Sequence, residues 1–204
     1  MKGPRFSLCL FIALAVMIAG VAVSASAQTP AAKTPPSTQL TQARVSPHDA
    51  INRNIDRANR VTIYYGRPFS KDAKTGELRK IWGGLVPYGR VWRLGADEAT
   101  LLLTQQPIMI GSTEIPAGAH SLFMLPDETG TSKLIINNQI GQWGLQYDEK
   151  QDFTRVDLVK TSVDPQVDQL TMAIDSNPSG GGIIKITWEK TQFSVAFTNS
   201  AAKK

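Results

Sequence analysis

The sequence has very few residues that bind transition metals or form disulfides. Among 204 residues there is one cysteine, Cys9, and there are two histidines, His48 and His120. Zinc sites are built mainly from Cys and His ligands, so one subunit cannot supply the usual set, and we expect no metal and no cofactor. Cys9 lies in a leading segment that we expect to be removed. The mature chain then has no disulfide and depends on its hydrophobic core, which a domain of this size is large enough to form.

That leading segment has the features of a secretory signal peptide. Lys2 and Arg5 precede an apolar run over residues 6–23, and an Ala-Ser-Ala triplet at 25–27 forms an A-x-A cleavage site. The run approaches the ~18 residues of a membrane-spanning helix, so a membrane anchor is the alternative. The small residues and the polar stretch after them favour cleavage after Ala27. We therefore expect residues 1–27 to be a signal peptide and the protein to be periplasmic or secreted, with no stable membrane span.

The chain also lacks a strong excess of one charge. It holds 22 basic and 17 acidic residues, for a formal charge of +5 that falls to +3 once Lys2 and Arg5 are removed. The basic residues are scattered along the chain. Nucleic-acid-binding proteins usually gather them in a patch, so we expect no nucleic-acid partner.

Large apolar residues are almost absent from residues 28–47, which are rich in Pro, Thr and Ala. Such a segment cannot bury enough surface to offset its ordering entropy, and it is predicted to be a disordered tether before a domain at 48–200. Ser46 and Pro47 resemble a helix N-cap and first helical position. No apolar helical period follows, so at most one turn is predicted, and His48 is expected in a mobile leading segment.

Beyond residue 60, apolar and polar residues alternate in short runs separated by Gly, Pro, Asp or Asn, which is typical of half-buried strands joined by turns. A turn is predicted at 56–59. The runs indicate nine or ten strands in an all-β fold, a single antiparallel β-sandwich of jelly-roll-like form. The positions expected on the core face are Val61, Ile63, Tyr65, Leu101, Leu103, Ile108, Ile110, Leu122, Met124, Leu134, Ile136, Val156, Leu158, Leu170, Met172, Ile174, Ile184, Ile186, Trp188, Phe193, Val195 and Phe197.

Two further predictions concern the C-terminal third. Residues 183–189 and 192–198 are expected to form a hairpin around Lys190 and Thr191, with Trp188 across from Phe193 as an aromatic pair. The acidic and polar segment 161–168 is expected to be a connection.

Several short sequence words occur together in a distinctive order. They include Ile81-Trp82-Gly83, Leu85-Val86-Pro87-Tyr88-Gly89, Val91-Trp92-Arg93, Gly95-Ala96, Glu98-Ala99-Thr100 and Gln142-Trp143-Gly144. From about residue 46 to 198 the chain resembles a family of exported bacterial proteins catalogued as a domain of unknown function. The resemblance implies an exported β-rich domain and carries no reaction, substrate or catalytic residue. This chain departs from it by a polar insertion at 70–77, expected to extend a hairpin, and by His120, where the pattern has Tyr.

Aromatic and Arg side chains gather in two Gly-rich stretches of this region. The candidate ligand-binding residues are Trp82, Tyr88, Arg90, Trp92, Arg93, Glu98, Trp143 and Tyr147. Rigid aromatic rings stack on sugars, Arg supplies directed donors, and loops on a rigid scaffold often carry binding residues. We therefore predict a non-catalytic module for a carbohydrate or another cell-envelope ligand. The alternative is that these side chains pack the loops onto the core.

Catalytic patterns are weak. There is no Gly-x-Ser-x-Gly motif, and a Ser-His-Asp arrangement would need His120, which is expected at the edge of the core beside Leu122 and Met124. Asp97 and Glu98 are adjacent, and adjacent side chains on an extended strand point to opposite faces. They are therefore not expected to flank one glycosidic bond.

Two other functional classes remain open. One is a hydrolase of envelope polymers in which Glu98 works with Asp148 or Asp152. The other is an interaction or structural domain that binds an exported protein through a sheet edge. The acidic residues at 148, 149, 152 and 157 lack the spacing of a calcium loop, and a solvated acidic loop is expected there.

Overall fold

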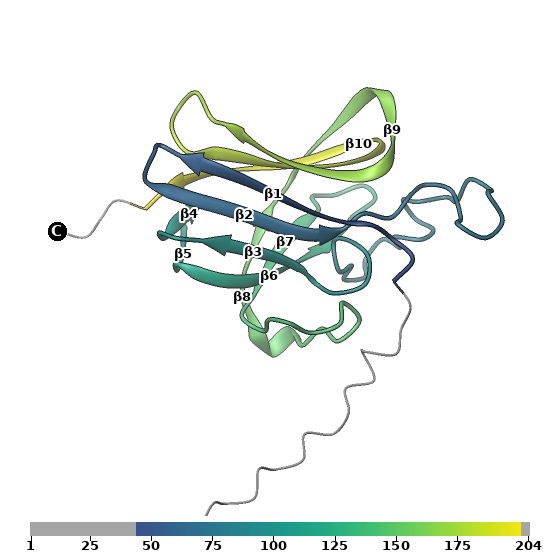
Figure 1. Cartoon of the computed structure of the whole chain (residues 1–204), viewed down its shortest axis with the longest axis horizontal. Coiled ribbons are helices and arrows are strands. Elements are labelled where there is room, and N and C mark those ends of the chain that lie inside the picture. Colours follow the sequence, from purple (N-terminus) through teal and green to yellow (C-terminus); the bar gives the residue numbers. More distant parts are fainter. Residues whose placement is uncertain (1–43, 201–204) are drawn as a thin grey trace, which may run out of the picture. The chain divides into compact units, whose positions relative to one another are not determined.

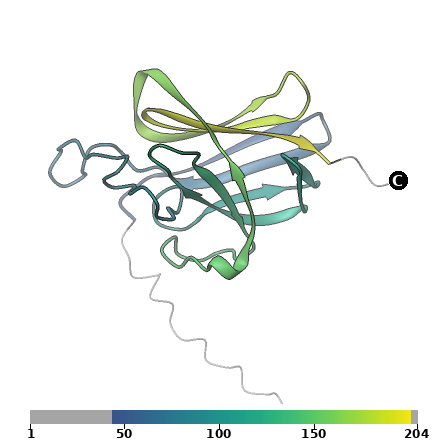
Figure 2. The same ribbon diagram turned by 180° about the vertical axis from the view of Figure 1, so that it is seen from behind.

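The computed structural model describes residues 44–200, and these fold into two antiparallel sheets packed face to face (Figures 1 and 2). The predicted all-β sandwich is confirmed. The predicted signal peptide and residues 28–43 of the predicted tether lie outside the described residues. Within 44–200 no helix is long and apolar enough to cross a membrane.

The larger sheet has six strands in the order β1-β2-β3-β6-β7-β8, and the smaller has four in the order β5-β4-β10-β9. The larger sheet consists of β1 (His48–Ile55), β2 (Asn59–Gly66), β3 (Thr100–Thr104), β6 (Gly118–Leu125), β7 (Lys133–Asn137) and β8 (Asp152–Asp157). The smaller consists of β4 (Ile108–Ile110), β5 (Thr113–Ile115), β9 (Val159–Ser176) and β10 (Gly182–Asn199). A 3-10 turn, η2 (Glu149–Gln151), precedes β8.

The main core fills the space between the sheets, and the predicted alternation places most of it. On β2, Val61, Ile63 and Tyr65 are all buried. The Tyr65 hydroxyl accepts a hydrogen bond from the Met172 backbone N–H at 2.9 Å, which satisfies both buried groups and joins the two sheets. The phenol is held away from water, and this burial raises the pKa of Tyr65.

The prediction that Leu101 and Leu103 of β3 face the core is wrong. Leu102 is buried, whereas Leu101 is half-buried and Leu103 is 39% exposed. Three consecutive leucines show no alternation, so the sequence does not reveal which of them faces inward. The pairing decides it, because Leu102 lies opposite Ile63 of β2, whose side chain is in the core.

The predicted C-terminal hairpin is also wrong. Residues 182–199 form one strand, β10, and its hairpin partner is β9. The segment 161–168, predicted as a connection, lies within β9. A bulge at Glu189, whose φ is 53°, shifts the register, so β10 continues where a turn was expected. Trp188 and Phe193 are therefore on the same strand, and both are buried.

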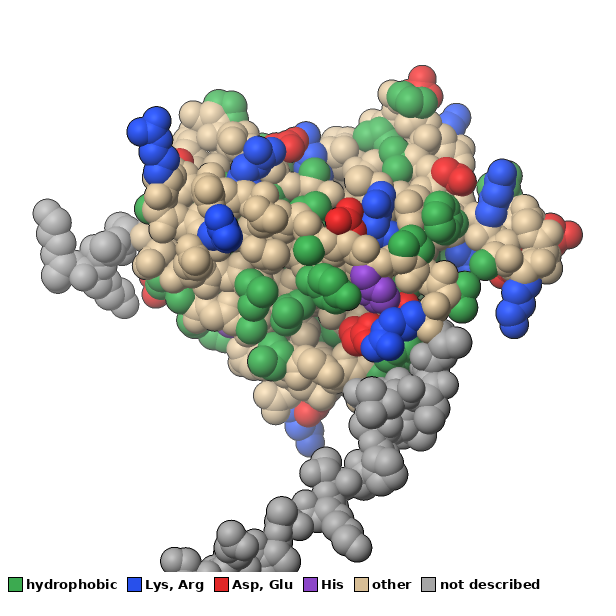
Figure 3. Space-filling model, viewed as in Figure 1, with side chains coloured by type: hydrophobic (Ala, Val, Ile, Leu, Met, Phe, Trp, Pro, Cys, Tyr) green, Lys and Arg blue, Asp and Glu red, His purple; other side chains and the backbone are tan. Residues whose placement is uncertain are grey.

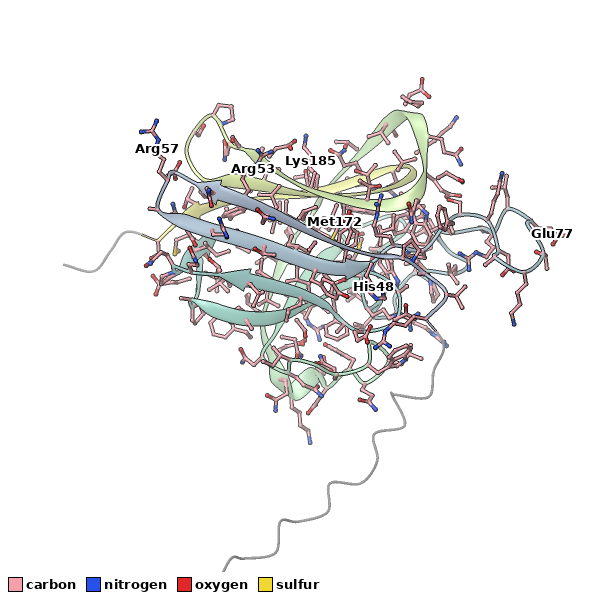
Figure 4. The ribbon with its side chains drawn as sticks, in the orientation of Figure 1. His48, Arg53, Arg57, Glu77, Met172 and Lys185 are labelled. Atoms are coloured by element: carbon pink, nitrogen blue, oxygen red, sulfur yellow. The ribbon has the colours of Figure 1, made fainter. Side chains whose placement is uncertain are left out.

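The first strand departs from prediction in the same way. His48 begins β1 and lies opposite Gly66 of β2, so the predicted helical turn and mobile leading segment are wrong. The β1–β2 turn is confirmed, with left-handed φ angles of 49° at Asp56 and 59° at Arg57. β1 carries few buried side chains because it is an edge strand, which is why its pattern was not recognised. The Arg53 guanidinium donates from Nε to the Ile174 carbonyl of β9 at 3.0 Å and so links the edges of the two sheets (Figure 4).

The insertion at 70–77 extends a hairpin, as predicted. Lys71 pairs with Leu78, and the Asp72 carboxylate accepts hydrogen bonds from the backbone N–H groups of Lys74 and Thr75. Figure 4 labels Glu77 at its outer end, well away from the sheets.

Candidate functional site

The two loops that carry the predicted site residues both reach the outer face of the larger sheet, and the first also packs on the main core. Residues 67–99 join β2 to β3, and residues 138–151 join β7 to β8. A second, small hydrophobic cluster lies under them, made of Ala99, Phe123 and Ile135, with Val91, Leu125 and Tyr147 packed against it. The first loop is thus held by apolar contacts on both sides of the sheet, and Tyr147 of the second loop packs on the outer side.

Backbone pairing sorts the side chains of the first loop. Trp92 exchanges two backbone hydrogen bonds with Met124 of β6, at 2.7 and 2.8 Å, and so continues the position of β3 in the sheet. Successive residues in such a pairing point to opposite faces. Trp92 therefore packs on the main core, while Val91 packs on the outer cluster.

The tryptophans of the predicted site are packing residues in this structure. The Trp82 ring lies 6.0 Å from that of Trp92 and 5.1 Å from Phe193, and the Trp92 ring stacks on Trp188 at 6.0 Å. Trp143, in the second loop, is only 8% exposed. A ligand role for these rings remains a prediction, and their contacts match the alternative that they pack the loops onto the core.

The other residues of the first loop are dispersed. Tyr88 is half-buried beside Gly83, and burial raises the pKa of its phenol. Arg90 is exposed and makes no hydrogen bond or ion pair with any residue in the range 44–200. Arg93 donates from Nε to the Gly95 carbonyl at 3.2 Å, and burial lowers the pKa of its guanidinium. These side chains and the tryptophans do not form one aromatic and Arg surface.

The second loop, by contrast, forms a concave polar site. An open groove of about 570 Å³ is lined by Gln139, Gln146, Tyr147, Asp148 and Gln151, and we call it the Tyr147 groove. The Oε1 atom of Gln139 is buried and has no hydrogen-bond partner among the described residues. An unpaired buried acceptor is costly, and this one belongs to a residue that lines the groove.

A hydrogen-bond network fixes the floor of the groove. The Tyr147 hydroxyl donates to Asp152 at 2.6 Å, and Arg155 donates from Nη2 to the same carboxylate at 2.7 Å. Asn137 donates to the other oxygen of Asp152 at 2.9 Å. Burial, and then the nearby Asp152 carboxylate, raise the pKa of Tyr147, so this phenol stays protonated and keeps donating at ordinary pH.

A third group of residues was not recognised in the sequence. His48 of β1 lies between two carboxylates, with its Nε2 atom 3.6 Å from Asp97 Oδ2 and 3.4 Å from Glu98 Oε2. The guanidinium of Arg44 donates to Glu98. We call His48, Asp97 and Glu98 the His48 cluster.

The prediction that Asp97 and Glu98 point apart is wrong because the chain is not extended there. Asp97 has a left-handed φ of 64°, and Leu94 has one of 57°. The turn between them brings both carboxylates to one side. Asp tolerates this conformation better than most residues, which is the one signal in the sequence that favoured such a turn.

The residues proposed as partners of Glu98 in a hydrolase have contacts of their own, and that role of Glu98 remains a prediction. Asp152 is bound by Tyr147, Arg155 and Asn137, and Asp148 caps η2 by accepting from the Lys150 backbone N–H at 3.0 Å. Asp148 and Asp152 thus belong to the loop's own structure.

The two sites are joined by a short stretch of backbone pairing. Glu98 lies opposite Trp143, the Ala99 N–H donates to the Gln142 carbonyl at 3.2 Å, and the Gly144 N–H donates to the Asp97 carbonyl at 2.9 Å. Movement of either loop would therefore disturb both the Tyr147 groove and the His48 cluster.

His120, the other histidine, is packed as predicted. It is 6% exposed, its Nε2 lies 2.9 Å from the Pro116 carbonyl oxygen, and its ring is beside Phe153. Across residues 44–200, no three His, Cys, Asp or Glu side chains have the arrangement of a metal site.

Fold and site together define an all-β sandwich domain whose loops carry a polar groove. The chain belongs to the family described as "Protein of unknown function (DUF2911)", whose model matches residues 46–197. The family resemblance seen in the sequence is thus confirmed. No curated protein and no solved structure matches the chain.

Proposed function

We propose that the protein is an exported binding module that recognises a hydroxyl-rich ligand, such as a carbohydrate of the cell envelope, in the Tyr147 groove. The observation that carries this proposal is an open groove lined mainly by the amide side chains of Gln139, Gln146 and Gln151. Amides offer both donors and acceptors, which is the combination that sugar hydroxyls require.

The size and rigidity of the groove fit this function. Its volume of about 570 Å³ falls within the range of small-molecule sites, roughly 300–1,000 Å³. Tyr147 is held by Asp152 and Arg155, so a ligand meets a side chain that is already ordered. Less ordering on binding means a smaller entropic cost.

The chemistry of the groove favours binding over reaction. The Tyr147 hydroxyl donates its proton in a hydrogen bond to Asp152, and the Asp148 carboxylate caps η2 by accepting from the Lys150 N–H. Neither is therefore poised as a nucleophile or base. Export is the part of the proposal that rests on residues 1–27 of the sequence alone.

The test is isothermal titration of the purified protein against a panel of soluble cell-envelope glycans, with Gln139→Ala and Gln151→Ala as groove variants. Each lost hydrogen bond should weaken binding by about 1 kcal/mol, or roughly fivefold in Kd. Gln166→Ala is the matched control, since this glutamine is exposed on β9. Equal affinity in all four proteins would place the ligand elsewhere, and no binding to any glycan would refute the proposed ligand class.

A further inference from the structure

The His48 cluster has unmet bonding capacity at its centre. The Nε2 atom of His48 and the Oδ2 atom of Asp97 are both buried, and neither has a hydrogen-bond partner among the described residues. Asp97 as a whole is only 8% exposed. Two carboxylates thus converge on one nitrogen of one imidazole.

The other side of that imidazole is open. The His48 side chain is 15% exposed although its Nε2 is buried. Because the two ring nitrogens lie on different sides of the ring, we place the exposed surface on the Nδ1 side. In Figure 3 a histidine side chain reaches the surface between acidic and basic side chains, in the region where Figure 4 labels His48. The solvent-facing side of the ring is therefore opposite a nitrogen that lies within 3.6 Å of two carboxylate oxygens.

Neighbouring residues hold the ring in place. The Tyr64 ring stacks on His48 with centroids 5.5 Å apart and planes inclined by 10°. Tyr64 is itself 43% exposed and forms an aromatic surface next to the histidine. The guanidinium of Arg44 lies against Glu98 and adds a positive charge at the edge of the cluster.

We propose that His48 is the general base of a second, hydrolytic site that acts on esters, with Asp97 and Glu98 as its positioning residues. Carboxylates at Nε2 favour the tautomer that carries its proton there, which leaves the lone pair on Nδ1. His48 Nδ1 takes a proton from water as the water oxygen bonds to the acyl carbon. The acyl C–O bond then breaks, and the imidazolium returns the proton to the departing alkoxide. The products are a carboxylic acid and an alcohol, and water is the only co-reactant.

An ester fits this geometry better than a glycoside. Glycosidases need two carboxylates on either side of one scissile bond. The carboxylates here are at most about 7 Å apart, and the imidazole nitrogen occupies the space where both could act. General-base hydrolysis of an ester needs one positioned base beside the attacking water, and an imidazole flanked by two carboxylates can supply it.

The first test uses bromoacetate alkylation of the purified wild-type protein, because His120 is a built-in control. His120 is buried, its Nε2 faces the Pro116 carbonyl, and its Nδ1 is buried too. We expect His48 to react faster than His120 and to give the Nδ1 product, identified by mass spectrometry and NMR. In the Asp97→Asn variant, the share of Nε2 product should rise. Equal reactivity of the two histidines, or reaction of His48 at Nε2, overturns the proposal.

The second test measures hydrolysis of p-nitrophenyl acetate. His48→Gln should lower kcat/KM at least 100-fold, at the lower end of general-base effects of about 10²–10⁴, whereas His120→Gln should keep the wild-type rate. Gln166→Ala, exposed on β9, should also keep it. Because this readout is ester hydrolysis and not glycan binding, failure of this proposal is separable from failure of the groove proposal. If His48→Gln does not fold, alkylated wild-type protein decides the question. Its activity should fall in proportion to the fraction of His48 modified, and unchanged hydrolysis refutes the assignment.

Discussion

Replacement of Gly66 by alanine should be unusually costly, because this glycine lies between the two halves of the His48 cluster. It pairs with His48 on β1, and its carbonyl accepts a hydrogen bond from the Ala96 N–H at 3.2 Å, next to Asp97. A Cβ at Gly66 would lie 2.8 Å from the Ala96 carbonyl carbon and closer still to its oxygen, where ordinary contact begins at 3.4 Å. Rotation of a side chain cannot relieve this overlap, since both atoms are backbone.

The magnitude follows from two opposing effects. Overpacking typically costs 1–3 kcal/mol, and the rigid backbone here places it at about 3 kcal/mol. Alanine also lowers the conformational entropy of the unfolded chain, which stabilises the folded state by about 0.4–1 kcal/mol. The expected net loss is about 2 kcal/mol, measured as the free energy of unfolding in urea.

The matched control for this loss is Gly89→Ala. Gly89 has a φ of 70°, and a Cβ added to it would have no neighbouring atom within 4 Å. Alanine there is destabilising only because of its left-handed conformation, by about 1–2 kcal/mol. The lower entropy of the unfolded chain offsets part of this loss, as at Gly66. A second readout is the alkylation of His48, which should lose its Nδ1 preference in Gly66→Ala and keep it in Gly89→Ala. If Gly66→Ala is no less stable than Gly89→Ala, the backbone contact does not hold the cluster as described.

Three further predictions concern single side chains. Trp92→Ala should lower the free energy of unfolding by about 3 kcal/mol, well beyond the effect of Tyr64→Ala, and comparable losses in urea titrations would contradict a core role for Trp92. Burial raises the pKa of Asp97, so the folded state binds this proton more tightly than the unfolded chain does. The free energy of unfolding therefore falls as the pH rises from the unfolded pKa of Asp97 through its higher folded pKa. Asp97→Asn, which suits a left-handed φ, should therefore raise the melting temperature at neutral pH, with the gain vanishing in acid; a pH-independent shift would show another cause. Arg57→Gly should stabilise the β1–β2 turn by up to about 1 kcal/mol, because glycine removes the cost of the 59° φ, and an unchanged melting temperature would show that the turn carries no such strain.

The sequence was informative where apolar and polar residues alternate along a half-buried strand. Apolar alternation located β2, β4 and the second half of β9, because a half-buried strand must alternate. It was uninformative in β3, where three leucines occur in a row, and in β1, where an edge strand buries little. It wrongly indicated a hairpin turn at residues 190–191, because a β-bulge interrupts the apolar alternation of a strand in the same way as a turn does.

The candidate site was harder to predict because composition does not say which way a side chain faces. Trp82 and Trp92 have the chemistry of sugar-stacking residues, but the pairing of Trp92 with Met124 turns its ring toward Trp188. Tyr147 was identified, yet the glutamines that line its groove were not, since amides are common in loops. Gln139 became notable only when its oxygen proved to be buried and unpaired among the described residues.

The His48 cluster shows most clearly what local sequence rules cannot supply. His48 and Asp97 are 49 positions apart in the chain, and they meet because β1 pairs with the end of β2 and the turn at 94–97 folds back over Gly66. One left-handed φ at Asp97 reverses the inference that adjacent carboxylates face apart. Glycine would adopt that φ more easily but has no carboxylate to offer. If the turn existed only to close the loop, glycine would serve it better. An aspartate there, with its carboxylate buried against a histidine, therefore favours a role in chemistry over a role in folding.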